Sequence, residues 1–391
     1  MKKRMMSILL SAIMAASCCV PAFARESKTL RFNADGKFTI LHLTDFHVTY
    51  PMNETIAEYI AEMLETVKPD LAIMGGDMTE NSDENKEKCI EQICNIFASH
   101  QTYFTFALGN HDAGEVNFNA YLNYGGPYCL AYDADPALSN IGTHDLPVYS
   151  SDGSRVAYNL YMFDSGNRAH DENGRDVGYD SVHKDQIEWF EARAEALKAA
   201  NGGEPVPSMF FQHIIVQEID DKVFFRSEKS AGAFGEDFDN GVHYTFLPIP
   251  RLYNFKEGYA MEKPCPGYYN YGQLDAAVKE GGVNAIVCGH DHFNNFIVDI
   301  DGVDIIATGS IKKHVPSRAQ IRGSRVIVLD ENSPSAYETE FVSYFDMAKA
   351  EGSSLYDLGE MNPVQTFFAD LWKLFVDSSL KVWTVISGIL Y

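Results

Sequence analysis

The feature that most constrains this chain is an alternation of apolar and amphipathic runs, in which each apolar run ends at polar residues. An apolar run over 38–44 precedes an amphipathic stretch over 54–67 and a second apolar run over 71–74. These patterns predict a strand, a helix and a strand. The order continues with a predicted helix over 84–99 and a strand over 103–107. Such alternation predicts an α/β fold with much parallel sheet.

The second half of the chain continues the pattern around one irregular stretch. We expect strands over 156–163, 209–211 and 285–288, helices over 184–200 and 273–279, and a hairpin of 296–300 with 303–307 that turns at Asp301-Gly302. Between about 218 and 270 there is little periodicity and much Gly, Pro, Tyr and Phe. We interpret this stretch as a long active-site loop.

Residues 1–24 have the pattern of a signal peptide. Basic residues at 2–4 precede an apolar run over 5–20 and the small-residue sequence Pro21-Ala22-Phe23-Ala24. The apolar run is shorter than the roughly 20 residues that a membrane-spanning helix needs. We therefore expect export, with the mature protein periplasmic or secreted. Ala15-Ala16-Ser17-Cys18 leaves a lipid-tethered form, attached through Cys18, as an alternative.

The charge balance limits the partners of the mature chain. Removal of Lys2, Lys3 and Arg4 with the signal peptide would take the formal charge from −24 to −27. A nucleic acid needs a basic surface, so the charge argues against nucleic-acid binding and against a nuclease. A small phosphorylated substrate remains compatible, because metal ions can supply local positive charge.

The predicted main domain covers residues 25–345, and residues 346–391 form a C-terminal tail. From 364 onward apolar residues are frequent, and charged residues recur at three- or four-residue spacing between 370 and 381. This pattern predicts an amphipathic helix and not a membrane span. We favour docking on the domain or self-association with a partner subunit over peripheral membrane contact, because basic residues are few.

Five polar motifs follow predicted strands. They are Asp45-Phe46-His47, Gly75-Gly76-Asp77, Gly109-Asn110-His111-Asp112, His213 and Gly289-His290-Asp291-His292. Ligand sites in α/β sheets lie beyond the carboxyl ends of the strands, so these motifs can meet at one edge. Burying so many carboxylates and imidazoles together is costly unless cations compensate them. The motifs therefore indicate a metal site.

Backbone geometry explains why residues of these types stand at these positions in the motifs. In an extended segment, alternate side chains point the same way, so Asp45 and His47 are expected to face a common ion, and His290 and His292 are expected to place two imidazoles on one side of their segment. The glycines before Asp77 allow a carboxylate to occupy a tight turn, where its two oxygens can bridge two ions.

Taken in order, the five motifs resemble those of the calcineurin-like metallophosphoesterase superfamily. Phe211-Gln212-His213-Ile214, Gly289 to Asn295 and Gly178-Tyr179-Asp180-Ser181 resemble its purple-acid-phosphatase-like branch. The resemblance covers about residues 37–310. It implies a two-sheet core flanked by helices, the four-layer sandwich of metallophosphoesterases.

The resemblance also implies residue roles. Asp45, His47 and His292 would hold a first divalent ion, Asn110, His213 and His290 a second, and Asp77 would bridge them. A hydroxide bridging the ions would attack phosphorus. His111 would steady the phosphate and protonate the leaving oxygen, with Asp112 as its orienting carboxylate.

One departure from the family pattern bears on the metal. Purple enzymes have a tyrosine ligand three residues after the bridging aspartate, whereas this chain has Asp77-Met78-Thr79-Glu80. Iron(III) at the first position is therefore in doubt, and Mn, Fe or Zn all suit the nitrogen and oxygen ligands. We expect Glu80 to be a solvated loop carboxylate.

These observations predict an exported, dinuclear phosphoesterase that hydrolyses phosphate monoesters. A phosphodiesterase or nucleotide hydrolase is an alternative within the same chemistry. An alternative of a different class is a non-catalytic, metal-containing surface binding protein.

Overall fold

The computed structural model describes residues 28–81, 83–223, 255–260, 262–312, 321–350 and 352–355. The predicted signal peptide, the tail beyond Leu355 and the central part of the predicted active-site loop lie outside these residues. Within the described part of the chain, no helix has the length and apolar character needed to cross a bilayer.

The first sheet contains the strands that precede the first three motifs. Its five strands have the order β15-β14-β2-β3-β4, and β2, β3 and β4 run parallel while β14 pairs antiparallel with β2 and with β15. The strand bounds are β2 Lys37–Leu43, β3 Leu71–Met74, β4 Phe104–Phe106, β14 Gly323–Asp330 and β15 Tyr337–Ser343. Helices α2 Glu54–Val67, α3 Lys86–Ser99, α4 Glu115–Gly125 and α8 Tyr344–Ala348, with the short helix η1 Gly126–Tyr128, belong to this half.

The second sheet has eight strands in the order β1-β5-β6-β9-β11-β13-β12-β10. Its centre, β6-β9-β11-β13, is parallel, and antiparallel strands flank this centre. The bounds are β1 Leu30–Arg31, β5 His144–Tyr149, β6 Val156–Met162, β9 Ser208–Gln212, β10 Phe255–Tyr259, β11 Val283–Cys288, β12 Asn295–Ile300 and β13 Val303–Ala307. Helices α5 Lys184–Ala200, α6 Glu218–Lys222 and α7 Gln273–Glu280 accompany this sheet.

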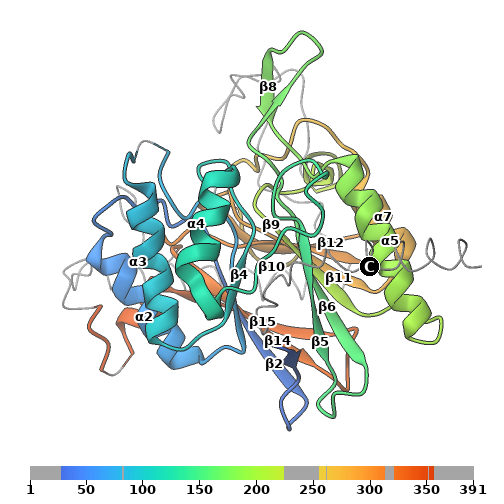
Figure 1. Cartoon of the computed structure of the whole chain (residues 1–391), viewed down its shortest axis with the longest axis horizontal. Coiled ribbons are helices and arrows are strands. Elements are labelled where there is room, and N and C mark those ends of the chain that lie inside the picture. Colours follow the sequence, from blue (N-terminus) through green and yellow to red (C-terminus); the bar gives the residue numbers. More distant parts are fainter. Residues whose placement is uncertain are drawn as a thin grey trace, which may run out of the picture.

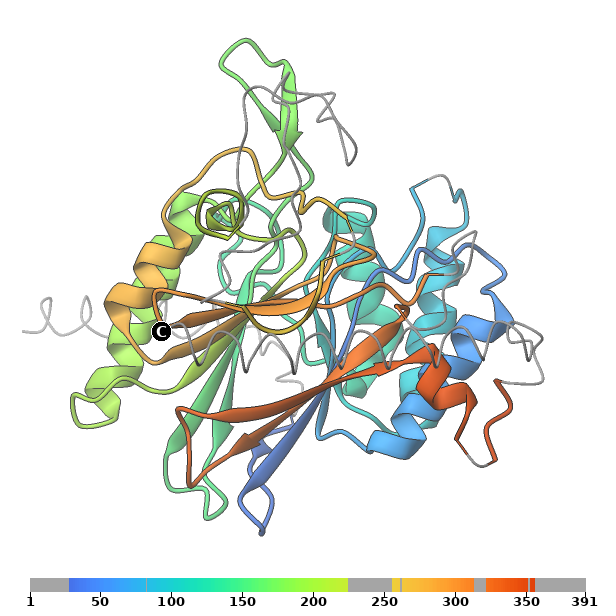
Figure 2. The ribbon, with the colours of Figure 1, turned by 180° about the vertical axis from the view of Figure 1, so that it is seen from behind.

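Three apolar clusters separate four layers. One cluster lies between the sheets and joins Ile40 and Ile73 of the first sheet to Leu160 and Val287 of the second. A second cluster packs α2, α3, α4 and α8 on the outer face of the first sheet, and a third packs α5 and α7 on the outer face of the second. Figures 1 and 2 show these two helical layers on opposite sides of the paired sheets. The expected two-sheet core flanked by helices is confirmed.

Local signals explain why the predicted elements form. Helix α2 begins where Asn53 Oδ1 accepts hydrogen bonds from the backbone N–H groups of Thr55 and Ile56, and it ends at Lys68 in a left-handed conformation. The turn between β12 and β13 contains Asp301 and Gly302, both with positive φ, as a tight Asp-Gly hairpin requires.

The prediction of one long loop over 218–270 is only partly correct. Helix α6 occupies 218–222, and β10 pairs antiparallel with β12 at the edge of the larger sheet. A register shift and Gly258 (φ 89°) interrupt β10, which weakens its periodic pattern. The boundary expected at residue 345 falls inside the fold, because α8 continues from β15 and Leu355 is fully buried.

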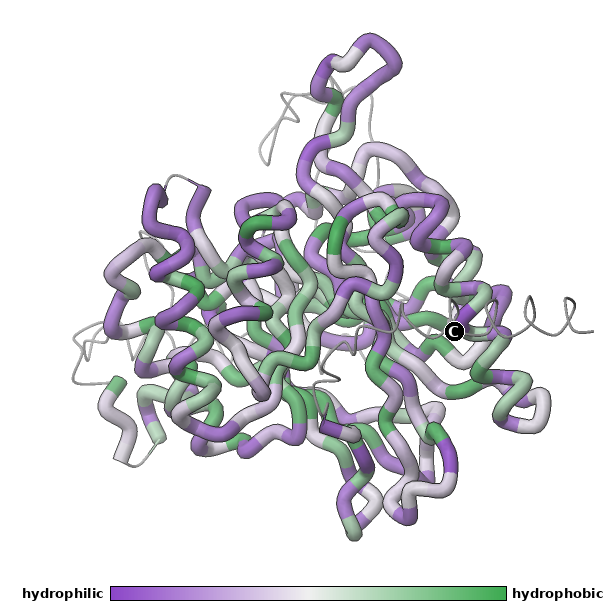
Figure 3. Tube along the Cα trace, in the orientation of Figure 1, coloured by the Kyte–Doolittle hydropathy of each residue, from purple (hydrophilic) through white to green (hydrophobic). Residues whose placement is uncertain are grey.

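A small two-stranded hairpin extends away from both sheets. It is formed by β7 Arg168–His170 and β8 Asp176–Tyr179, which pair antiparallel. The hairpin projects at the top of Figure 1, and its outer end is hydrophilic in Figure 3. The base of the hairpin leads into the Gly178-Tyr179-Asp180-Ser181 motif.

We predict that His144 makes folding stability sensitive to acid. His144 is fully buried on β5, with Nε2 2.7 Å from Thr105 Oγ1 and Nδ1 2.7 Å from Gly142 O. Burial lowers the pKa of His144 from 6.5 to about 4. The unfolded chain therefore takes up a proton first as the pH falls. His144 contributes on the order of 3 kcal/mol to the free energy of unfolding, and this contribution is complete above pH 6.5 and is lost toward pH 4.

His144→Gln should reduce this loss, so its melting temperature should fall less than that of the native protein between neutral pH and about pH 5. Differential scanning calorimetry measures the difference. His170→Gln, at an exposed position on β7, is the control and should follow the native protein. Identical acid sensitivity in His144→Gln would contradict the prediction.

Candidate metal centre

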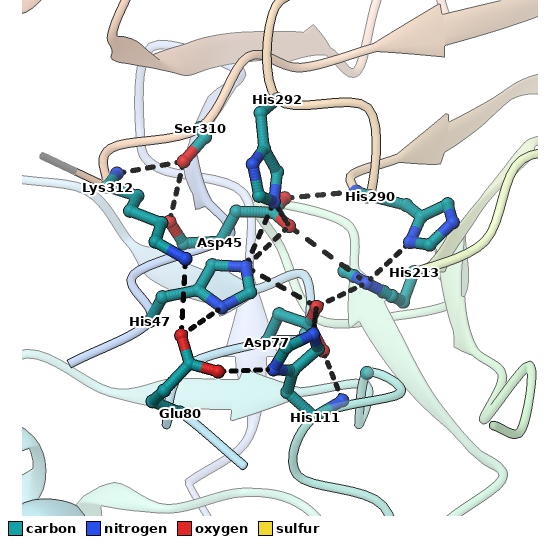
Figure 4. A network of polar contacts seen from close by, with 12 residues as sticks. Asp45, His47, Asp77, Glu80, His111, His213, His290, His292, Ser310 and Lys312 are labelled. Atoms are coloured by element: carbon teal, nitrogen blue, oxygen red, sulfur yellow. Dashed lines mark hydrogen bonds and ion pairs between the residues drawn. The ribbon is translucent and has the colours of Figure 1, made fainter. Parts of the chain in front are cut away.

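The five polar motifs converge at one end of the paired sheets. Three of them follow β2, β3 and β4 of the smaller sheet, and two follow β9 and β11 of the larger sheet. Figure 4 shows their side chains pointing toward one another from these separate segments. The site is therefore built between the sheets, and both must be in place to form it.

The backbone of the ligand loops is unusual. Asp45, His47, Asp77 and His290 have φ values of 54°, 46°, 52° and 71°, in the left-handed region that non-glycine residues rarely adopt. Each such residue costs on the order of 1 kcal/mol. The expectation that extended alternation aligns Asp45 with His47, and His290 with His292, is therefore wrong for these segments. Tight left-handed turns direct the side chains instead.

Asp45, His47 and His292 form the first cluster of candidate ligands. Asp45 Oδ1 lies 3.3 Å from His292 Nε2 and 3.6 Å from His47 Nε2, and the two Nε2 atoms are 3.0 Å apart. Asp45 Oδ2 accepts hydrogen bonds from Thr44 Oγ1 (2.7 Å) and from His290 N (3.0 Å). The protein thus fixes one oxygen of Asp45 and leaves the other facing two imidazoles.

Asp77, His213 and His290 form a second cluster. His213 Nδ1 donates to Gly75 O at 2.8 Å, which turns His213 Nε2 to 3.2 Å from Asp77 Oδ2. His290 Nδ1 lies 3.3 Å from that same Nε2 atom. A hydrogen bond that fixes one ring nitrogen and leaves the other free is the usual arrangement of a metal-binding histidine.

Asp77 also takes part in a third cluster, with His47 and His111. Asp77 Oδ2 is 3.5 Å from His47 Nε2, so it lies between the first cluster and the second. Asp77 Oδ1 accepts from His111 N at 2.6 Å. This position between two ligand sets is what a bridging carboxylate requires.

Asn110 provides a separate indication that the site fits cations. Asn110 is 7% exposed, and its side-chain Oδ1 is buried without a hydrogen-bond partner. Its neighbour His111 binds Asp77 through the backbone, so Asn110 lies beside the shared carboxylate. A buried carbonyl oxygen without a partner is costly unless it coordinates an ion. The donor set of oxygens and imidazole nitrogens suits a dinuclear centre of divalent ions.

The pKa values of the candidate ligands show how strongly the charges of the site act on one another. Burial alone would raise the pKa of Asp45, but the nearby His213, His292 and His47 hold it well below its usual range. Burial alone would lower the pKa of His213, but Asp77 and Asp45 raise it to about 10. A protonated His213 therefore partly compensates the carboxylates, and a bound cation would take over that role.

Two motif glycines permit the close approach of the loops. Gly76 has φ 96°, and a Cβ atom there would lie 2.5 Å from His213 Nδ1. A Cβ atom on Gly109 would overlap the backbone nitrogen of Asp77. A larger residue at either position would separate segments that bring ligands together.

Asp112 does not orient His111 as expected. Asp112 is fully buried, and its carboxylate accepts from the backbone N–H groups of Gly109 (2.8 Å), Met78 (2.9 Å) and Asp77 (3.1 Å). Burial, followed by the charge of Asp77, raises the pKa of Asp112 to about 7. Asp112 therefore ties the third loop to the second, and its contacts are with backbone and not with the imidazole.

Glu80 occupies the orienting position, which corrects the expectation of a solvated carboxylate. Glu80 Oε1 lies 2.8 Å from His111 Nδ1, and Oε2 lies 3.3 Å from His47 Nδ1. Lys312 Nζ lies 3.2 Å from the same Oε2. Burial alone would raise the pKa of Glu80, but Lys312, with smaller effects of His47 and His111, lowers it to about 2. Glu80 is thus an ionised link between a candidate ligand and His111 (Figure 4).

Sequence reasoning missed Lys312, which has no motif around it. Its backbone N–H donates to Asp45 O at 3.0 Å and to Ser310 Oγ at 2.8 Å, and Ser310 Oγ donates to Asp45 O at 2.7 Å. The segment after β13 is therefore fastened to a candidate metal ligand. The spacing of Glu80 from Asp77, equal to that of the missing tyrosine, was a usable signal for Glu80.

The model of the calcineurin-like phosphoesterase family matches residues 38–294, which is more than half of the chain. The chain belongs to the calcineurin-like phosphoesterase family. The recognised resemblance is therefore confirmed, and the matched region contains all the predicted metal ligands.

Three of the curated relatives that this chain matches come from Arabidopsis thaliana. The chain is 23% identical over 373 residues to "Probable inactive purple acid phosphatase 29", which covers 83% of this chain and 86% of the relative. It is 23% identical over 346 residues to "Probable inactive purple acid phosphatase 14", with 79% of each covered. Among solved structures, a dimetal phosphatase from Danio rerio is 12% identical with a TM-score of 0.44, covering 78% of this chain and 99% of that one.

We predict that Asp77→Asn loses at least one bound ion per chain. An amide oxygen carries no charge and cannot hold two cations as a carboxylate does. Elemental analysis of the purified protein measures the metal content, and circular dichroism checks folding. Asp152→Asn, at an exposed turn carboxylate, is the matched control. Unchanged metal content in folded Asp77→Asn would exclude Asp77 as a shared ligand.

Proposed function

We propose that this protein is a dinuclear metal-dependent hydrolase of phosphate monoesters. The observation that carries the proposal is the position of Asp77, which belongs to the second cluster and lies 3.5 Å from His47 of the first, while His111 Nε2 lies 3.9 Å from the same Asp77 oxygen. Family membership supports the phosphoester chemistry.

Asp45, His47 and His292 would hold one divalent ion, Asn110, His213 and His290 the other, and Asp77 both. Bound ions of this kind polarise the phosphoryl group and lower the pKa of water. The chain itself contributes fixed geometry, since the ligands extend from tight turns that neighbouring loops hold in place. Mn, Fe and Zn all suit these nitrogen and oxygen donors.

His111 is suited to donate a proton to the leaving oxygen. Its side chain is 27% exposed, whereas that of His47 is 1% exposed. Glu80 holds Nδ1, so Nε2 is the nitrogen free to face a substrate. The imidazolium must carry a proton on each nitrogen before it donates from Nε2, and the Glu80 carboxylate stabilises that cation by accepting from Nδ1–H. Burial lowers the pKa of His111, which favours release of the proton.

The substrate proposed here is small. The formal charge of −24 argues against nucleic acid, whereas bound cations would attract a phosphate group locally. Export, proposed from residues 1–24, would place the activity outside the cytoplasm. The proposed C-terminal helix concerns residues that the structure does not describe.

A second candidate is a non-catalytic, metal-containing binding protein. The names of the Arabidopsis relatives, which include the word inactive, favour this alternative for those proteins. In this chain the full set of predicted ligands is accompanied by a partly exposed His111 held by Glu80. A purely structural metal site has no need of such a residue, so we place hydrolysis first.

Hydrolysis of aryl phosphate monoesters and diesters after metal removal tests the proposal. The full chain would be treated with chelator, assayed, and assayed again after addition of Mn²⁺, Fe²⁺ or Zn²⁺. We expect monoester turnover to disappear with the chelator and to return with at least one metal. Turnover of the diester alone would support a phosphodiesterase, and no turnover despite bound ions would support the binding protein.

We predict that His111→Ala retains both ions but lowers kcat by about 10²- to 10⁴-fold. The loss should be larger for an alkyl phosphate than for a nitrophenyl phosphate, because a nitrophenolate leaves without protonation more readily. Glu80→Gln should lower kcat in the same direction by less. His100→Ala, at the end of α3, is the control. Equal losses for the two esters would show that His111 is not the proton donor.

A further inference from the structure

Tyr179 extends the candidate site on the side of His290. The tyrosine is the last residue of β8, and its ring lies 4.3 Å from the His290 ring, centroid to centroid, at an interplanar angle of 81°. Tyr179 is partly exposed, and it belongs to the Gly178-Tyr179-Asp180-Ser181 motif, none of whose residues is a candidate metal ligand. A partly exposed aromatic side chain therefore borders a candidate ligand of the site.

The residues around Tyr179 fix its position. Tyr268 N donates to Tyr179 O at 2.8 Å, and Ser181 Oγ donates to Tyr269 O at 2.6 Å. Asp180 Oδ1 lies 3.0 Å from His183 Nε2. Tyr268 and Tyr269 are thus bonded to the Gly178-Tyr179-Asp180-Ser181 motif. Hydrogen bonds at Tyr179 and at Ser181 thus fix the backbone that carries the Tyr179 ring.

Arg168 of β7 lies over one face of the Tyr179 ring. Its guanidinium carbon lies 4.8 Å from the ring centroid, within the range of a cation–π contact. The guanidinium also donates from Nε and Nη2 to the two carboxylate oxygens of Asp176, both at 2.8 Å. Asp176 compensates the charge of Arg168. Tyr179 and Arg168 together therefore present a flat surface with little net charge. A planar organic group would suit it better than a second phosphate.

We propose that Tyr179, backed by Arg168, is a specificity-determining residue that selects phosphate esters with a planar aromatic group. This inference rests on the proposed function, since the phosphoryl group would bind the ions while the organic group packs against the tyrosine ring. Aromatic rings in such contact contribute beyond the area that they bury. An alkyl ester lacks that contact and binds more weakly.

Binding of non-hydrolysable phosphonates tests the inference without any need for turnover. Isothermal titration calorimetry would compare phenylphosphonate with methylphosphonate on the full chain loaded with Zn²⁺, with metal content measured for each variant. The native protein should bind phenylphosphonate about tenfold more tightly. Tyr179→Leu should lose most of this preference while keeping its affinity for methylphosphonate, and Tyr179→Phe should retain the preference.

Tyr124→Leu, at an exposed tyrosine of α4 that contacts Glu87, is the matched control and should behave as the native protein. A nucleoside 5′-phosphonate in parallel distinguishes the source of the aromatic group. Tighter binding than phenylphosphonate identifies a nucleobase, and weaker binding with the phenyl preference intact identifies a smaller aryl group.

Equal affinity of the native protein for phenylphosphonate and methylphosphonate would overturn the inference, as would a preference that persists in Tyr179→Leu. Failure of both phosphonates to bind the loaded protein would overturn it too. Absence of ester hydrolysis together with a Tyr179-dependent preference would overturn only the proposed function.

Discussion

The two oxygens of the Asp77 carboxylate divide their contacts between the protein backbone and the ligand cluster, and the arrangement of the surrounding loops depends on that division. Oδ1 accepts from the backbone of His111, while Oδ2 faces His213 and His47. Asp112 strengthens the same junction by accepting from the backbone of Asp77. Buried carboxylates this close repel one another unless imidazolium groups or metal ions intervene. The energetic cost of the site is therefore also the source of its affinity for cations.

The ligands gather around Asp77 only because the two sheets are held face to face. The ligand loops of the smaller sheet supply Asp45, His47 and Asp77, whereas those of the larger sheet supply His213, His290 and His292. Apolar packing between the sheets sets the distance across which these groups meet. A cavity in this layer would move one half of the ligand set relative to the other, so packing far from the site governs its geometry.

Sequence patterns predicted the elements whose hydrophobic period is clean and missed those in which polar residues are buried. Helix α2 occurs over the predicted 54–67, but β14 was not predicted, and its buried Ser324 and Arg325 break the apolar alternation that marks a strand. At the site, motif spacing and family resemblance identified the candidate ligands, yet not the roles of Glu80 and Asp112. Those roles follow from the turn after β3, where Glu80 N bonds to Val48 O at 3.1 Å. The spacing of Glu80 from Asp77 marked the position of Glu80, but a contact between residues so far apart in the chain has no signature in local sequence.

The replacement of tyrosine by Glu80 changes what the site can do. A carboxylate at this position contacts both His47 and His111, and Lys312 keeps it ionised. Two imidazoles thereby share one anion, so the orientation of His47 is linked to that of His111. A structural metal site needs only the first of these contacts. The second stabilises positive charge on the partly exposed His111 imidazole, as the proposed role of His111 in proton donation would require.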